Sequence, residues 1–99
     1  MKNVIFLQTN LFYSEIKSMV IQFLKFTGIS DYTLKEFNET PFINGRAAKI
    51  FLGNEEIGYL GEINPKVLYN FKIEEPVVAA EIKLDKCIAY AFKSHKKPT

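Results

Sequence analysis

The clearest periodic pattern of the chain is an amphipathic segment near its amino-terminal end. Between residues 12 and 28, apolar positions recur at steps of three and four, and mostly polar side chains fill the positions between them. This spacing predicts an α-helix with one apolar face. Asn10 or Ser14 is expected to cap its start, and Gly28 to end it, because glycine readily adopts the left-handed conformation found after a helix. The positions of the apolar face are Phe12, Ile16, Met19, Val20, Phe23, Leu24 and Thr27.

Much of the remaining chain has the patterns of β-strands. Alternating or apolar runs predict strands over residues 4–8, 32–37, 46–52, 56–63 and 77–85. The first run contains Val-Ile-Phe-Leu, which predicts a buried strand. Residues 53–55, Gly-Asn-Glu, favour a tight hairpin between the third and fourth strands, and residues 41–45 are expected to form a loop.

A short second helix is predicted after the fourth strand. Asn64 supplies a capping side chain, and Pro65 suits the first helical position. Val67, Leu68 and Phe71 are expected to point inward. The resulting order, β-α-β-β-β-α-β, predicts an α+β fold with a mostly antiparallel sheet, one long helix and one short helix.

Charge and composition define the extent of the domain. The chain has 99 residues, of which 47% are hydrophobic and 24% charged, so disordered and low-complexity classes are excluded. The net charge is +2, but three lysines lie in residues 93–99, and without them ten bases face eleven acids, a net charge of −1. We therefore interpret residues 1–92 as a single domain and residues 93–99 as a basic, mobile tail. The near-neutral body disfavours nucleic-acid binding.

The cysteine content and the apolar runs indicate the compartment. Cys87 is the only cysteine, so an intrachain disulfide is excluded and nothing indicates secretion. No apolar run approaches the roughly 18–20 residues that cross a bilayer. The apolar run over residues 4–7 is too short for the core of a signal peptide. We expect a soluble, cytoplasmic protein with no membrane contact.

Candidate chemistry is sparse. The only histidine, His95, lies in the predicted tail, which disfavours nucleophilic catalysis by a serine or cysteine with a histidine base. No group of histidine, cysteine or carboxylate residues has the spacing of metal ligands. Gly53, Gly58 and Gly61 lie in a predicted hairpin and do not open a helix, which disfavours a phosphate-binding loop. The sequence therefore assigns no catalytic residue, no metal and no cofactor.

Arg46 is the one arginine among twelve lysines, and it follows a turn glycine. A single arginine in a chain that otherwise uses lysine suggests a position where a planar group with several hydrogen-bond donors is required. We interpret it as the partner of a buried carboxylate, such as that of Glu62 or Glu81, or as an interface contact. The candidate interface or structural residues are Arg46, Glu62, Asn64, Gly45 and Gly61.

The second half of the chain resembles a known family. The matching runs are Pro-Phe-Ile-Asn-Gly-Arg-Ala-Ala-Lys-Ile at 41–50, Ile-Gly-Tyr-Leu-Gly-Glu-Ile-Asn-Pro-Lys-Val-Leu at 57–68, Asn-Phe at 70–71, Pro-Val-Val at 76–78 and Glu-Ile at 81–82. This ordered set is similar to the C-terminal, catalytic-like module of the phenylalanyl-tRNA synthetase β subunit, of the archaeal and eukaryotic type. The resemblance extends over residues 4–87 and concerns the second half of that module. Asn64 stands where many relatives have histidine.

The resemblance implies a class II aminoacyl-tRNA synthetase-like fold and a place in protein biosynthesis. In that ligase the α subunit carries the active site, whereas the β module lacks the three catalytic motifs of its class and serves as a partner surface in the heterotetramer. The resemblance therefore implies a non-catalytic fragment or stand-alone relative that acts as an interaction and assembly module in phenylalanine–tRNA ligation. The expected partner is the synthetase α subunit or a second copy of the chain, and direct contact with tRNA is not expected.

The length of the chain leaves alternatives open. The full catalytic-like module is longer, so one edge or face of the sheet is expected to lack cover and to invite pairing with another chain. An alternative function is a regulatory module that has kept a synthetase-like pocket for an amino acid or a nucleotide.

Overall fold

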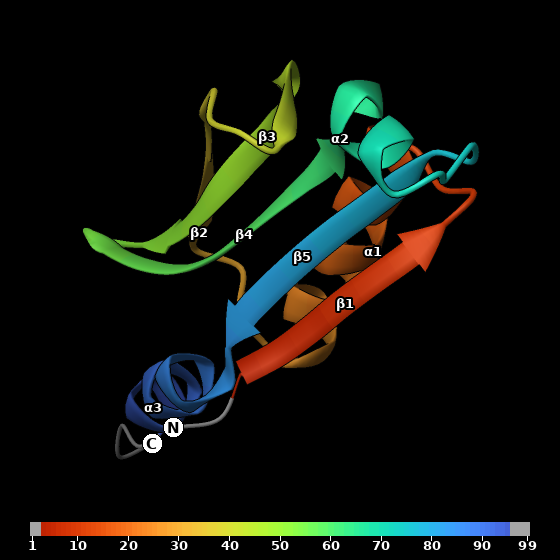
Figure 1. Ribbon diagram of the computed structural model, residues 1–99. Coiled ribbons are helices and arrows are strands. Elements are labelled where there is room, and N and C mark those ends of the chain that lie inside the picture. The colour runs from red at the N-terminus through yellow and green to blue at the C-terminus, as the bar shows by residue number, and fades with distance from the viewer. Residues whose placement is uncertain (1–2, 96–99) are drawn as a thin grey trace.

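The computed structural model describes residues 3–95 and contains five strands and three helices (Figure 1). The strands form one antiparallel sheet in the order β1-β5-β4-β3-β2. The α+β class and the antiparallel sheet are thus confirmed, but the prediction of only two helices is wrong. The elements are β1 (Asn3–Thr9), α1 (Tyr13–Phe26), β2 (Tyr32–Glu36), β3 (Phe42–Leu52), β4 (Glu55–Ile63), α2 (Pro65–Asn70), β5 (Val77–Lys83) and α3 (Leu84–His95).

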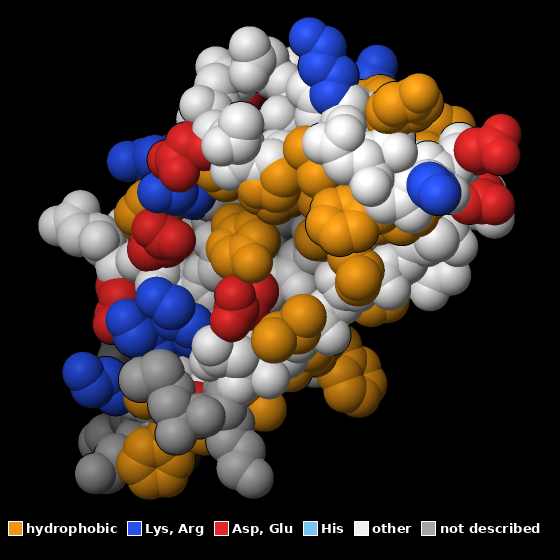
Figure 2. All heavy atoms as spheres, viewed as in Figure 1, with side chains coloured by type: hydrophobic (Ala, Val, Ile, Leu, Met, Phe, Trp, Pro, Cys, Tyr) orange, Lys and Arg blue, Asp and Glu red, His pale blue; other side chains and the backbone are white. Residues whose placement is uncertain are grey.

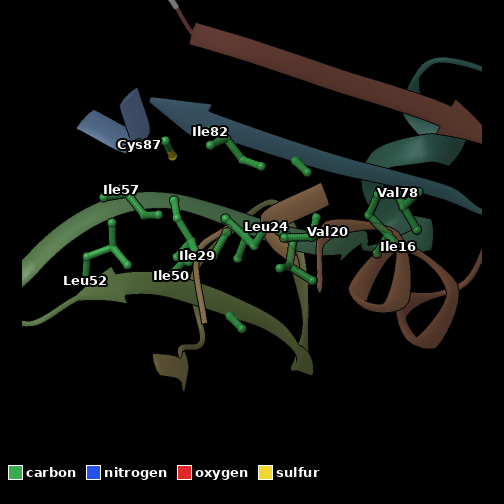
Figure 3. Close-up of a cluster of buried hydrophobic side chains, with 13 residues drawn as sticks. Ile16, Val20, Leu24, Ile29, Ile50, Leu52, Ile57, Val78, Ile82 and Cys87 are labelled. Atoms are coloured by element: carbon green, nitrogen blue, oxygen red, sulfur yellow. The ribbon is translucent and has the colours of Figure 1, made fainter. Parts of the chain in front are cut away.

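The hydrophobic core lies between the sheet and α1, which crosses behind β5 and β4 in Figure 1. Ile16, Val20 and Leu24 are the buried residues of α1, as the spacing predicts. Figure 3 shows them facing apolar side chains of the sheet. Burying each such side chain stabilises the fold by roughly 1.5–3 kcal/mol. Their partners in the core are Ile29, Ala48, Ile50, Leu52, Ile57, Leu60, Val78, Ala80, Ile82 and Cys87.

Gly28 terminates helix α1 as the residue after its C-cap, Thr27, as predicted. Gly28 has a φ of 86° and donates its N–H to the carbonyl oxygen of Lys25 at 3.0 Å. The N–H of Ile29 donates to the carbonyl oxygen of Leu24 at 2.9 Å. These two bonds satisfy carbonyl groups of the last helical turn, so the chain reverses here without leaving them unpaired.

Strand β1 forms where predicted, but the prediction that it is buried is wrong. It lies at the edge of the sheet, and among residues 3–95 its one neighbouring strand is β5. Ile5 and Leu7 are 74% and 69% exposed, and Phe6 is half-buried. An apolar run shows that both faces of a strand are apolar, but it does not show whether a second neighbour covers them.

The start of β3 differs from the loop predicted over residues 41–45. Strand β3 already begins at Phe42, which pairs with Ile63, and regular pairing resumes at Ala47 with Gly61. Between these two pairs, β3 has four residues and β4 has one. The segment is therefore a bulge of several residues within a strand, and bulges redirect the side chains that they contain.

Helix α3 replaces the end of the predicted fifth strand and the first residues of the predicted tail. Strand β5 ends at Lys83, and the helix covers Leu84–His95. Cys87 is buried in the core, and Tyr90, three residues later, packs against it. Asp85 in the first turn favours a helix start. The alternation of apolar and polar residues in β5 continues in the sequence to Asp85, so the sequence does not reveal where the strand period changes to the helix period. Residues 96–99 lie outside the described residues, so the mobility of the tail stays a prediction.

Polar contacts join α3 to the rest of the domain. Lys86 Nζ lies 2.8 Å from Glu55 Oε2 at the start of β4, and the hydroxyl of Tyr90 hydrogen-bonds to Asp31. The hydrogen bond and the charge of Lys86 lower the pKa of the Glu55 carboxyl. The stabilisation that this contact contributes is therefore fully present above the ordinary pKa of a glutamate. It is lost as the pH falls through the lowered pKa of Glu55. Because Glu55 is exposed, salt screens this contribution.

Cys87 is expected to react slowly with thiol reagents while the protein is folded. Its side chain is buried, and this burial raises the pKa of the thiol, so little thiolate forms near neutral pH. A colorimetric thiol assay should show no fast phase for the folded chain and one reactive thiol per chain in urea. A fast, stoichiometric reaction without denaturant would show that α3 does not pack on the core as described.

Candidate functional site

Glu62 is the one buried charged residue within residues 3–95, with 4% of its surface exposed. It lies on β4 opposite the bulge of β3. Its Oε2 accepts a hydrogen bond from Arg46 Nη1 at 3.1 Å, and its Oε1 accepts one from the backbone N–H of Tyr13 at 2.8 Å. A single carboxylate thus joins β4, β3 and the first residue of α1.

The start of α1 explains why a carboxylate is placed there. The N-cap residue is Phe12, whose side chain has no acceptor, so the predictions of Asn10 or Ser14 are wrong. The carboxylate of Glu15 accepts the N–H of Phe12 at 2.9 Å, and Glu62 accepts the next N–H. The partial positive charge at a helix start stabilises both carboxylates, and both satisfy N–H groups that the helix itself leaves unpaired.

Arg46 pairs with Glu62, the first of the two carboxylates that the sequence suggested. The arginine side chain is 52% exposed, so about half of it faces solvent. Glu81 has other partners, since it accepts a hydrogen bond from Asn3 Nδ2 at 2.6 Å. Burial, followed by a hydrogen bond with Glu81 and its charge, raises the pKa of the Tyr59 hydroxyl. Glu81 thus belongs to a cluster on β1 and β5, whereas Glu62 belongs to the cluster at the start of α1.

Gly45 shapes the bulge that brings Arg46 to Glu62. Its φ of 83° lies in the left-handed region, where side chains other than that of glycine are strained. Its N–H donates to Oδ1 of Asn38 at 2.9 Å, which ties the bulge to the segment between β2 and β3. The conformation of Gly45 and its hydrogen bond to Asn38 together fix the direction in which Arg46 leaves the strand.

Gly61 permits a ring to lie directly on β4. A Cβ atom at this position would lie 2.5 Å from Cδ1 of Phe42, so only glycine leaves room for the ring. The Phe42 ring also contacts the rings of Phe37 and Tyr59, each at a centroid distance of 5.9 Å. The result is a small aromatic cluster on the face of the sheet opposite α1.

A hollow of about 410 Å³ adjoins this aromatic cluster. Its charged residues form ion pairs, with Lys49 Nζ 3.6 Å from Glu56 Oε1 and 3.9 Å from Glu39 Oε1. The hollow is shallow and mixed in polarity, so it offers both rings and charges to a small molecule. It is lined by Phe37, Glu39, Thr40, Pro41, Phe42, Lys49, Glu56, Tyr59, Ile63 and Ala79.

Asn64 caps α2, as predicted. Its Oδ1 accepts the N–H of Lys66 at 2.9 Å, and its own N–H donates to the carbonyl oxygen of Pro41 at 2.8 Å. Leu68 is the buried residue of this helix. The prediction that Phe71 points inward is wrong, because α2 ends one residue earlier and Phe71 is 72% exposed.

The predicted site residues thus occupy one end of the β3–β4 pair. Arg46 and Glu62 are in contact, and Gly45 precedes the arginine. Gly61 precedes Glu62 on β4, and Asn64 follows the end of that strand, two residues after Glu62. Sequence reasoning missed the N–H of Tyr13, and no sequence signal identifies a backbone donor so distant along the chain. The structure describes no group of three or more potential metal ligands within residues 3–95. In the same range, no helix is long and apolar enough to cross a membrane.

A solved structure with a similar fold is the pyrrolysyl-tRNA synthetase from Desulfitobacterium hafniense. The similarity covers 97% of this chain and 37% of that one, with a TM-score of 0.65 and 14% sequence identity. At this identity the comparison concerns the fold alone. The fold is therefore class II synthetase-like.

Three relatives share more of the sequence, and each is named as a phenylalanine–tRNA ligase beta subunit. The protein of Methanocaldococcus jannaschii is 44% identical over 73 residues, that of Thermococcus onnurineus 42% over 72, and that of Methanococcus vannielii 38% over 73. These matches cover 73–74% of this chain but only 12–13% of each relative. The family model for the phenylalanyl tRNA synthetase beta chain CLM domain matches residues 7–84. The chain therefore belongs to the family of the phenylalanyl-tRNA synthetase beta chain CLM domain.

Proposed function

We propose that this chain is a non-catalytic interaction and assembly module in phenylalanine–tRNA ligation, equivalent to the second half of the β-subunit catalytic-like module. The observation that carries the proposal is the number of large apolar side chains that reach solvent. Ten are exposed within residues 3–95: eight on β1, α1, α2 and α3, and two, Phe12 and Phe71, in the caps of α1 and α2. Apolar side chains grouped on a surface are typical of sites where proteins associate.

The expected partner is the synthetase α subunit. The surface proposed for it is the α2 end of the domain, where Tyr69 and Phe71 are 81% and 72% exposed. Phe12, at the start of α1, is 54% exposed and lines the same hollow as Leu68 of α2. Exposed aromatic residues contribute strongly to binding when a partner covers them. Direct contact with tRNA is not part of the proposal, because residues 1–92 have a net charge of −1.

Co-expression with the α subunit of the same source organism tests this function. Affinity purification of the tagged chain should recover the α subunit in stoichiometric amount. Combined Tyr69→Ala and Phe71→Ala substitutions should reduce the recovery at least about tenfold, which corresponds to about 1.4 kcal/mol. Ile5→Lys, at an equally exposed apolar position on β1, is the matched control and should leave recovery unchanged. Recovery of the tagged chain without α subunit would refute the proposal.

A second candidate function is the binding of a small regulatory molecule. The hollow beside Phe42 and Tyr59 favours it, because it combines aromatic rings with charged groups on Lys49 and Glu56. A ligand at one hundred times its Kd stabilises a protein by about 2.7 kcal/mol. A rise of Tm with phenylalanine or ATP, but not with leucine, would support this candidate. An unchanged Tm with all three compounds would exclude these ligands.

A further inference from the structure

Strand β1 has the composition of a central strand but the position of an edge strand. Within residues 3–95, no strand pairs with its outer side (Figure 1). Its residues 3–9, Asn-Val-Ile-Phe-Leu-Gln-Thr, include neither a charged residue nor a proline. Natural edge strands usually contain such residues, because these residues prevent pairing with another chain. The outer edge of β1 is therefore open to pairing.

An apolar hollow of about 190 Å³ lies between β1 and α1. Met19 of α1 and Val4 of β1 line it and remain 43% and 38% exposed. This face of α1 is thus only partly covered by the sheet, and one more strand beside β1 would cover it. The remaining lining residues are Phe6, Ile16, Val20, Phe23, Ala80 and Ile82.

The opposite face of β1 is also apolar and uncovered. Ile5 and Leu7 lie there, and they pair in register with Glu81 and Ala79 of β5. Figure 2 shows apolar side chains grouped on this face of the molecule. A strand added beside β1 would therefore need apolar side chains on both of its faces. Strand β1 itself has this pattern, with Val4 and Phe6 on one face and Ile5 and Leu7 on the other.

We propose that two copies of this chain associate by antiparallel pairing of their β1 strands, with Phe6 opposite Phe6 of the second copy. Directly opposite residues of an antiparallel pair lie on the same face of the sheet. This register places Ile5 against Leu7 of the second copy twice, once on each side of the central pair. It joins the two sheets into one and brings both α1 helices to the same face, where each copy supplies side chains beside the hollow of the other.

The charge and the length of β1 both fit a second copy of the chain as its partner. Because residues 3–9 of β1 are uncharged, the two-fold arrangement brings no like charges together along the paired strands. Seven residues of strand extend over about 23 Å. This short contact buries less surface than the roughly 1,200–2,000 Å² of a standard interface, so we expect a dimer with a micromolar Kd.

This inference rests on the proposed assembly function and deepens it, because it names a second copy as a partner. It uses a different surface from the α2 end, so the two can fail separately. If the chain recovers the α subunit but does not associate with itself, the β1 pairing alone is overturned. Failed recovery of the α subunit by a chain that dimerises would overturn the proposed function alone.

Sedimentation velocity of the 99-residue chain over micromolar concentrations tests the self-association. The wild type should shift from monomer to dimer as its concentration rises. Ile5→Lys should weaken the dimer by about tenfold or more, because it places a charge against an apolar side chain. Tyr69→Lys is the matched control, since Tyr69 is also exposed but lies on α2, and it should dimerise like the wild type. A wild type that stays monomeric, or an Ile5→Lys variant that dimerises normally, would overturn the proposal.

Cross-linking of cysteine variants tests the register. Ile5→Cys chains mixed with Leu7→Cys chains should form disulfide-linked mixed dimers under mild oxidation, because opposite Cβ atoms lie about 4.5–5.5 Å apart. Each variant alone should cross-link much more slowly. Buried Cys87 does not compete. Rapid cross-linking of either variant with itself would overturn the proposed register, since it would centre the pairing on residue 5 or residue 7.

Discussion

Gly58→Ala is expected to leave the chain largely unfolded, or to cost about 3–5 kcal/mol of stability if it still folds. A Cβ atom at this position would lie 2.2 Å from the backbone carbonyl oxygen of Glu81 and 3.1 Å from the Cα atom of Ile82. Both atoms belong to the backbone of β5, so strands β4 and β5 would have to separate in the middle of the sheet. Such a loss is a large part of the 5–15 kcal/mol that stabilises a typical domain. Urea unfolding followed by circular dichroism measures it.

Gly61→Ala is the matched control on the same strand. Its Cβ atom would meet the ring of Phe42, which is a side chain and can shift, so we expect a loss of only about 1–3 kcal/mol. Adding Phe42→Leu should recover part of that loss but should not help Gly58→Ala. If Gly58→Ala unfolds at the urea concentration of the wild type, the close approach of β4 to β5 is wrong.

Glu62→Ala is expected to cost about 2–4 kcal/mol, the second large effect. The substitution removes the acceptor of the Tyr13 N–H and the partner of Arg46, and charged hydrogen bonds of this kind are individually worth about 1.5–3 kcal/mol. Glu62→Gln should cost less, because the amide oxygen still accepts the N–H of Tyr13. Arg46→Ala should also cost less, about 1–2 kcal/mol, because the arginine is half-exposed and water can replace it.

The order of the three variants in urea unfolding is the result to check. Glu75→Ala, which removes an exposed glutamate, is the control and should change stability by less than about 0.5 kcal/mol. If Arg46→Ala destabilises the chain more than Glu62→Ala, the bond at the start of α1 is not the larger contribution. The role of Glu62 would then be mainly that of a partner for the arginine.

Features set by neighbouring residues could be predicted from the sequence. Gly28 ends α1, Asn64 caps α2, and the two-residue turn at Gly53 and Asn54 joins β3 to β4. In each case a few adjacent residues contain the information, because turn and cap chemistry is local. The pairing of Arg46 with a buried carboxylate could also be suggested, because Arg46 is the one arginine in a chain with twelve lysines.

Features set by distant residues could not be predicted. The edge position of β1 depends on which strand pairs beside it, and its apolar run would suit a central strand equally well. Helix α1 begins at Tyr13, whose N–H donates to Glu62, a residue 49 positions later in the sequence. Helix α3 follows β5 without a turn, so no breaker marked the change of period.

Sedimentation velocity of an equimolar mixture with the synthetase α subunit tests the central claim most directly. An assembly module should form a boundary that moves faster than either protein alone and contains both in a constant ratio. Substitution of Tyr69 and Phe71 by alanine should remove this boundary, whereas Ile5→Lys should keep it. Two independent boundaries at micromolar concentration, at the positions of the separate proteins, would contradict the account.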